Sequence, residues 1–206
     1  MFVRTVYATG DPAALDRTLD GLRAEAVGLL APQPGYRGFG LFADRELGIL
    51  TMGSWWESAR AERESDERLR GRRAELLAPF AGTVTTDLWQ AVVAARPVQA
   101  GPGAWFRLAR FDFDRVQGDR IAAAFRERAL PAMQRIDGFL GGSMLFAVED
   151  ERGSVGGLFA DRAALVASRG AVAEARARAV AGGGVRLRSL EEFEVILLDL
   201  PKQPSP

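Results

Sequence analysis

The alternation of apolar and polar residues divides the chain into two stretches with the same order of predicted elements. In the first stretch, β-branched and aromatic side chains follow Met1 and predict a strand. From Leu15 on, leucine and alanine recur at spacings of three and four, which predicts an amphipathic helix that ends at Pro32–Gly35. A hairpin, a highly charged helix and a last strand follow. The strands predicted here are 2–8, 38–43, 47–55 and 83–93.

The second stretch repeats the first at a constant distance along the chain. Gly138 follows Gly35 by 103 residues, and Phe159 follows Trp56 by the same number. The strands predicted in this stretch are 105–111, 142–148, 154–159 and 185–198, the last displaced by one further residue. We interpret the chain as a tandem duplication. We predict a first unit at 1–95, a linker rich in proline and glycine at 96–103, a second unit at 104–200 and a disordered tail at 201–206.

The order strand, helix, strand, strand, helix, strand is that of a ferredoxin-like unit, so the predicted fold class is α+β. Helices cover one face of such a sheet. The first strand also carries apolar residues on its other face, as Val3 and Tyr7 show beside Phe2 and Val6. Leaving two such faces in water would be costly. We therefore expect the two sheets to pack face to face within one chain.

Local signals refine this scheme. Asp11 and Ser58 are predicted to cap the helices that follow them, and Ser65 to begin a further helix. Pro131 should kink the first helix of the second unit. Residues 60–75 carry many charges of both signs, which we interpret as a solvated helix face rather than a docking surface.

Composition excludes several kinds of chemistry. Basic and acidic residues number 27 each, so no net field favours nucleic acid or an anionic membrane. The chain has no His and no Cys, which excludes serine–histidine triads, thiolate chemistry and the common zinc and haem ligands. We expect no metal and no cofactor. With no long apolar run and no leader-like start, we expect a cytoplasmic protein that does not enter membranes.

The repeated unit resembles the antibiotic-biosynthesis-monooxygenase-like domain of the dimeric α+β barrel superfamily. The residues that carry the resemblance are Pro34-Gly35-Tyr36 and Asp137-Gly138-Phe139, each followed about twenty residues later by Trp56-Glu57-Ser58-Ala59 or Phe159-Ala160-Asp161-Arg162. The resemblance implies an intramolecular version of that barrel, as a monomeric pseudo-dimer or a homodimer. It also implies small aromatic or apolar ligands. Members of the superfamily include cofactor-free oxygenases, haem-degrading enzymes and isomerases. The chain lacks the His of the haem-degrading branch and the Asn of the quinone-forming branch.

Candidate site residues lie mainly in the first unit. Arg4 and Arg107 occupy equivalent positions on the two first strands. Each could hold an anionic oxygen, or could pack its stem and pair with an acid such as Asp87. We expect Arg4, Tyr36 and Trp56 as catalytic residues. The expected ligand-binding residues are Tyr7, Trp55, Trp89 and Arg107. The tryptophans could line an aromatic cavity or simply fill the core.

Two functions of different class fit these residues. The first is a cofactor-independent monooxygenase, an oxidoreductase acting on an aromatic polyketide-like substrate, with Arg4 stabilising the substrate anion. The second is a non-catalytic ligand-binding or structural pseudo-dimer module. A cavity plugged by Trp55 and Trp56 favours the structural module, whereas an open cavity in either unit fits the enzyme and the ligand-binding module.

Overall fold

The computed structural model describes residues 1–95, 100, 103–182 and 184–200. Two units emerge. The first holds Met1–Trp89 with the segment from Val195, and the second holds Gln90–Glu194. The strands β4 and β8 therefore each contribute to both units. The predicted linker and the predicted tail lie outside the described residues, apart from Ala100 and Gly103.

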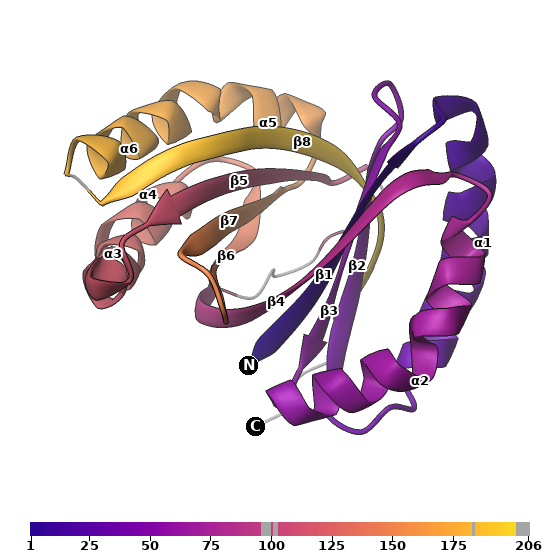
Figure 1. Ribbon diagram of the computed structural model, residues 1–206. Coiled ribbons are helices and arrows are strands. Elements are labelled where there is room, and N and C mark those ends of the chain that lie inside the picture. The colour runs from indigo at the N-terminus through magenta and orange to yellow at the C-terminus, as the bar shows by residue number, and fades with distance from the viewer. Residues whose placement is uncertain (96–99, 101–102, 183, 201–206) are drawn as a thin grey trace, which may run out of the picture. The chain divides into compact units, whose positions relative to one another are not determined.

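The first unit has the predicted order of elements. Its strands and helices are β1 (Phe2–Gly10), α1 (Pro12–Leu30), β2 (Tyr36–Asp44), β3 (Ile49–Trp56), α2 (Ala59–Leu77) and β4 (Ala81–Ala95). The strand order is β4-β1-β3-β2, with β8 next to β2. Antiparallel pairing sets Arg4 opposite Ser54 on β1 and β3. Both helices lie on the same side of this sheet (Figure 1).

The core of the first unit fills the space between that sheet and its helices. Leu15, Leu19 and Leu22 of α1 are each at most 2% exposed, which confirms the predicted stripe. They pack with Leu41, Leu50 and other apolar residues of the sheet. The capping predictions at Asp11 and Ser58 are also confirmed, because each side chain accepts a hydrogen bond from a backbone N–H of the first turn.

The second unit repeats the plan with a broken first helix. Its elements are β5 (Trp105–Phe113), a 3₁₀ turn (Arg115–Gln117), α3 (Gly118–Ala124), a π-helical segment (Phe125–Ala129), α4 (Leu130–Met133), β6 (Phe139–Ala147), β7 (Arg152–Phe159), α5 (Arg162–Ala167), α6 (Arg169–Ala181) and β8 (Val185–Asp199). The strand order is β8-β5-β7-β6, with β4 next to β6. The π-helical segment ends just before Pro131, whose missing N–H and ring interrupt regular helix there. The predicted α+β class with two ferredoxin-like units is confirmed.

The prediction that Ser65 begins a new helix is wrong. Helix α2 runs without a break from Ala59 to Leu77, and Ser65 lies within it, 1% exposed. In the second unit the equivalent residue, Ser168, does stand between two helices, α5 and α6. The serine therefore marks a helix boundary in only one of the two copies.

Gly35 and its repeat Gly138 adopt a left-handed conformation, with φ of 76° and 78°. A Cβ added at Gly35 would come within 2.7 Å of the Cβ of Ala61. We therefore expect Gly35→Ala to lower the free energy of unfolding by about 1–2 kcal/mol from the backbone term alone. Urea denaturation measures the loss.

The matched control is Gly28→Ala on helix α1, where an added Cβ meets nothing within 4 Å. This change should stabilise the protein by up to about 1 kcal/mol, because alanine is the better helix former. Equal effects of the two substitutions would contradict the assignment of strain to Gly35.

Candidate functional site

A cavity of about 50 Å³ lies between the sheet of the first unit and helices α1 and α2. Its walls are mostly apolar and include Leu22, Ala26 and Leu30 of α1, Leu69 of α2, and Phe39 and Met52 of the sheet. Its polar members are Arg4, Ser54 and Arg73. A typical small-molecule pocket has about 300–1,000 Å³. The cavity is therefore smaller than such a pocket, and leucine side chains of both helices line it.

Arg4 is the most buried cation of this cavity, with 4% of its surface exposed. Its Nη1 donates to Oε1 of Glu62 at 3.2 Å, to the Glu62 carbonyl at 3.4 Å and to Oδ1 of Asp66 at 3.3 Å. Among the described residues, Nε and Nη2 of Arg4 have no hydrogen-bond partner. The expected acid, Asp87, was therefore wrong, because the acids that pair with Arg4 come from helix α2.

Arg73 is the second cation of the cavity. Its Nη2 lies 2.7 Å from Oδ1 of Asp66, the same oxygen that Arg4 contacts. Its Nη1 is buried and, within the described part of the chain, has no hydrogen-bond partner. A buried donor without a partner is costly, so this nitrogen is a candidate contact for a ligand oxygen.

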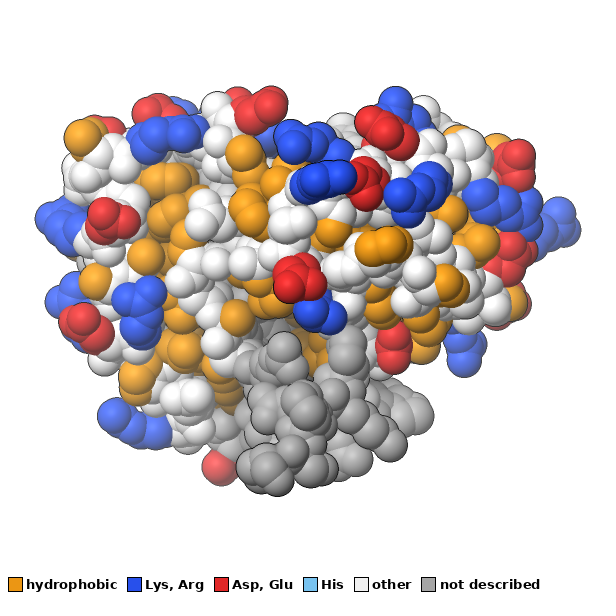
Figure 2. Space-filling model, turned by 90° about the horizontal axis from the view of Figure 1, so that it is seen from below, with side chains coloured by type: hydrophobic (Ala, Val, Ile, Leu, Met, Phe, Trp, Pro, Cys, Tyr) orange, Lys and Arg blue, Asp and Glu red, His pale blue; other side chains and the backbone are white. Residues whose placement is uncertain are grey.

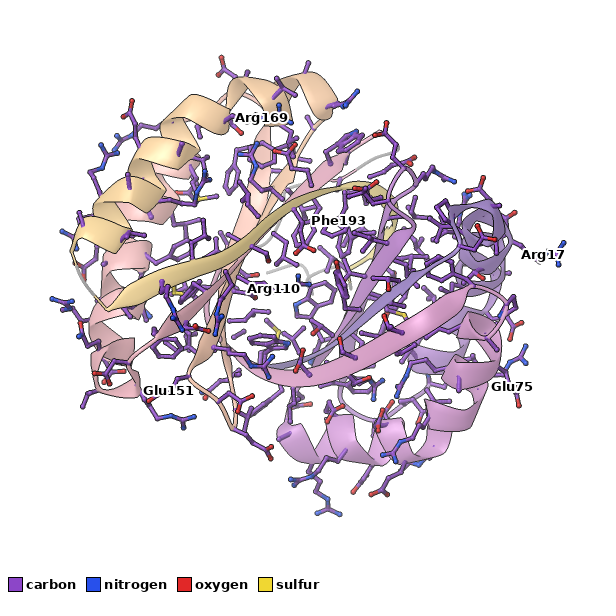
Figure 3. All side chains as sticks on the ribbon, turned by 45° about the horizontal axis from the view of Figure 1, so that its top comes forward. Arg17, Glu75, Arg110, Glu151, Arg169 and Phe193 are labelled. Atoms are coloured by element: carbon purple, nitrogen blue, oxygen red, sulfur yellow. The ribbon has the colours of Figure 1, made fainter. Side chains whose placement is uncertain are left out.

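The charged run on α2 is thus only partly a solvated face. Glu62 and Ser65 are buried, while Glu75 is exposed and labelled on the outer side of α2 in Figure 3. Asp66 follows Glu62 by four residues and Arg73 follows Asp66 by seven, helical spacings that place all three on the sheet-facing side of the helix. That spacing is visible in the sequence and could have identified them.

Burial dominates the electrostatics of this cluster. Desolvation lowers the pKa of Arg4, and the neighbouring Arg73 lowers it further, against the opposing effect of Glu62 and Asp66. Desolvation likewise raises the pKa of Glu62 above its ordinary value, although Arg4 opposes the shift. For Asp66, burial is outweighed by hydrogen bonds from Arg70 and Arg73, so its pKa is lowered. The cluster therefore keeps Asp66 ionised and penalises charge on Arg4 and Glu62.

Trp56 lies next to Arg4 and Tyr36 packs against Trp56, and neither aromatic residue lines the cavity. The guanidinium carbon of Arg4 lies 5.3 Å from the centre of the Trp56 ring. Trp56 is fully buried and donates to Oγ of Ser54 at 2.9 Å. Tyr36 packs edge-on against Trp56 and donates its hydroxyl to Asp199. Burial and this hydrogen bond raise the pKa of Tyr36.

Three other predicted ligand-binding residues lie on the opposite face of the same sheet. Side chains alternate along a strand, so Tyr7 on β1 and Trp55 on β3 point away from the face that carries Arg4 and Trp56. Trp89 donates its indole N–H to Oγ1 of Thr5, which places it on that same opposite face. The structure therefore does not bring Tyr7, Trp55 and Trp89 to the cavity.

Arg107 occupies the equivalent place in the second unit, 4% exposed and stacked on Phe159 as Arg4 is on Trp56. All its donor nitrogens have partners. Nε and Nη2 donate to Oε1 of Glu192 at 3.0 and 2.8 Å, Nη1 donates to Ser168, and Nη2 also donates to the Leu165 carbonyl. Arg107 is therefore held within its own unit by four hydrogen bonds, which involve all three of its nitrogens.

Neither a membrane-spanning helix nor a carboxylate cluster suited to a metal ion occurs in the described part of the chain. On the surface seen in Figure 2, positive and negative side chains are interspersed.

No family model matches the chain. The uncharacterized protein MT2635 of Mycobacterium tuberculosis (strain CDC 1551 / Oshkosh) is 25% identical over 97% of this chain and 85% of its own length. Among solved structures, a candidate monooxygenase from Lactobacillus acidophilus NCFM matches 97% of this chain and 95% of its own, with a TM-score of 0.75 and 11% identity. An anthrone oxidase-like protein matches 99% and 94%, with a TM-score of 0.65 and 12% identity.

These likenesses define the fold. The chain shares its fold with these two solved proteins, and it is the α+β fold that the sequence resemblance predicted.

Proposed function

We propose that this chain is a monooxygenase that oxidises an aromatic, polyketide-like substrate without a bound cofactor, and that its site is the cavity of the first unit. The observation that supports the proposal is the composition of that cavity. Apolar walls suit an aromatic body, and two guanidiniums in the lining, that of the buried Arg4 and that of the partly buried Arg73, suit an oxygen that becomes anionic during reaction.

The chemistry requires the substrate to supply the electrons. An anthrone-type substrate loses a proton from its ring methylene to give an electron-rich enolate, and O₂ oxidises that carbon. The methylene becomes a carbonyl, one oxygen atom of O₂ remains in the product, and the other leaves as water. Positive charge from Arg4 and Arg73 would stabilise the enolate oxygen, in a site from which leucine side chains exclude water.

One observation favours binding without catalysis as a second candidate. Within the described residues, the cavity lining includes no carboxylate, so no general base touches the space that a substrate would fill. Glu62 has a raised pKa, which suits a base, but it pairs with Arg4 and is not among the lining residues of the cavity. A protein with this second function would bind the aromatic molecule and consume no oxygen.

Oxygen uptake by the purified chain with 9-anthrone, corrected for uptake without protein, tests the proposal. We expect Arg73→Ala to lower the protein-dependent rate by about 10²–10³-fold, the range for loss of one oxyanion-stabilising donor. The matched control is Arg176→Ala, because Arg176 is the repeat of Arg73 in the second unit and lies near Arg107. Its rate should remain close to that of the unmodified chain.

Circular dichroism and thermal denaturation of both variants establish that they fold. Absence of protein-dependent uptake across quinol and anthrone substrates would reject the oxygenase. An equal loss of the oxygen-uptake rate in Arg73→Ala and Arg176→Ala would contradict the assignment of the site to the first unit.

A further inference from the structure

The two units place the partner of their buried arginine on different elements. In the second unit the carboxylate comes from β8, where Glu192 pairs directly with Arg107 across the strands. Glu192 is also held by Arg169, which begins α6 and is labelled in Figure 3. In the first unit the carboxylate comes from helix α2, as Glu62.

At each of these two positions, one unit has the glutamate and the other unit has a leucine. The repeat of Glu62 is Leu165, which offers Arg107 only its backbone carbonyl. The repeat of Glu192 is Leu88, one position before Trp89, the counterpart of Phe193. Since Trp89 lies on the face of Thr5, the alternation along β4 places Leu88 on the face of Arg4.

The exchange leaves the first unit with polar atoms that the second unit satisfies. Arg4 uses only Nη1 for hydrogen bonds, at 3.2–3.4 Å, and its Nε and Nη2 face no acceptor among the described residues. Ser65 Oγ and Arg73 Nη1 are buried without partners. The repeat of Ser65, Ser168, by contrast accepts from Arg107 and donates to the Leu165 carbonyl. A buried donor without a partner, such as Nη1 of Arg73, favours an acceptor supplied from outside.

We infer that the cavity of the first unit binds an apolar molecule through a carboxylate, which accepts from Nε and Nη2 of Arg4 as the Glu192 carboxylate accepts from Arg107. The second unit thus carries its own copy of the ligand's head group and is closed to it. The inference rests on the proposed function for the location of the site and adds the substrate class, an aromatic carboxylate. The cavity of about 50 Å³ would take the head group, and a ring attached to it would require apolar side chains of the lining to move.

Isothermal titration of the full chain with benzoate, and with benzamide as its neutral isostere, tests the inference without any turnover. We expect one benzoate per chain and at least a tenfold weaker binding of benzamide. Equal binding of the two, or no binding of benzoate, would overturn the inference.

Substitution at Leu88 provides the decisive variant, because removal of Arg4 itself could unfold the chain. Leu88→Glu introduces into the first unit the carboxylate that Glu192 supplies in the second, and should weaken benzoate binding at least tenfold. Leu88→Gln has nearly the same shape without the charge and should bind benzoate within about threefold of the unmodified chain. Unchanged affinity in Leu88→Glu, with the fold retained, would overturn the assignment to Arg4.

Different results would reject the oxygenase activity and the carboxylate site. Benzoate binding that responds to Leu88→Glu, together with no oxygen uptake on any substrate, would reject the oxygenase and keep the carboxylate site. Oxygen uptake that depends on Arg73, with no preference for carboxylated over neutral substrates, would do the reverse.

Discussion

Replacing Arg4 with methionine is expected to lower the free energy of unfolding by about 3–5 kcal/mol, the range for removing one partner of a buried ion pair. Arg4 and Glu62 are 4% and 5% exposed, so loss of the cation leaves the Glu62 carboxylate buried beside Asp66 without its counter-charge. Urea denaturation followed by circular dichroism measures the change.

The repeat supplies the control for this prediction. Adding Glu62→Leu to Arg4→Met removes both charges and introduces the leucine that the second unit has at the equivalent position, Leu165. Replacement of a whole buried pair by apolar residues is often neutral, so the double variant should recover most of the lost stability. A free energy of unfolding for Arg4→Met within about 1 kcal/mol of that of the unmodified chain would contradict the prediction that Glu62 depends on Arg4 for its counter-charge.

Replacing Trp56 with alanine is expected to cost about 3–5 kcal/mol, the usual range for truncating a large buried aromatic residue. Trp56 has no exposed surface, packs against Tyr36 and supports the guanidinium of Arg4. The substitution opens a void beneath Arg4 and removes the donor to Ser54.

Trp56→Phe is the matched comparison, since Phe159 fills the equivalent place in the second unit and stacks with Arg107 at the same distance of 5.3 Å. We expect it to lose less than half as much stability as the alanine variant. The two variants can be compared by thermal denaturation at one protein concentration. Equal losses would show that the indole hydrogen bond, rather than the volume of the ring, decides the effect.

Much of the fold is visible in the sequence because it depends on local patterns. The leucine stripe of α1, the caps at Asp11 and Ser58 and the strand alternation each depend on residues within a few positions of one another. The interval of 103 residues between equivalent positions then predicts the elements of the second unit from those of the first. The same interval explains why Gly35 and Gly138 share an unusual backbone conformation.

The candidate site was predicted less completely. Arg4 and Trp56 were expected from their place on the strands and their resemblance to the family, and they do lie together. Tyr7, Trp55 and Trp89 were expected from residue type alone, and strand alternation puts them on the other face of the sheet. Arg73 was hidden in a run of mixed charge, where only its helical spacing from Glu62 distinguishes it from solvated neighbours.

By itself, the sequence determined two α+β units in tandem, the buried faces of their elements, and the absence of His and Cys chemistry. Only the tertiary structure decided which acid meets each buried arginine. Arg4 and Arg107 are equivalent in sequence, yet one pairs with a helix residue 58 positions away and the other with a strand residue 85 positions away. Such pairing depends on how helix and strand pack around each guanidinium, since a buried cation takes the nearest acceptors that the fold supplies.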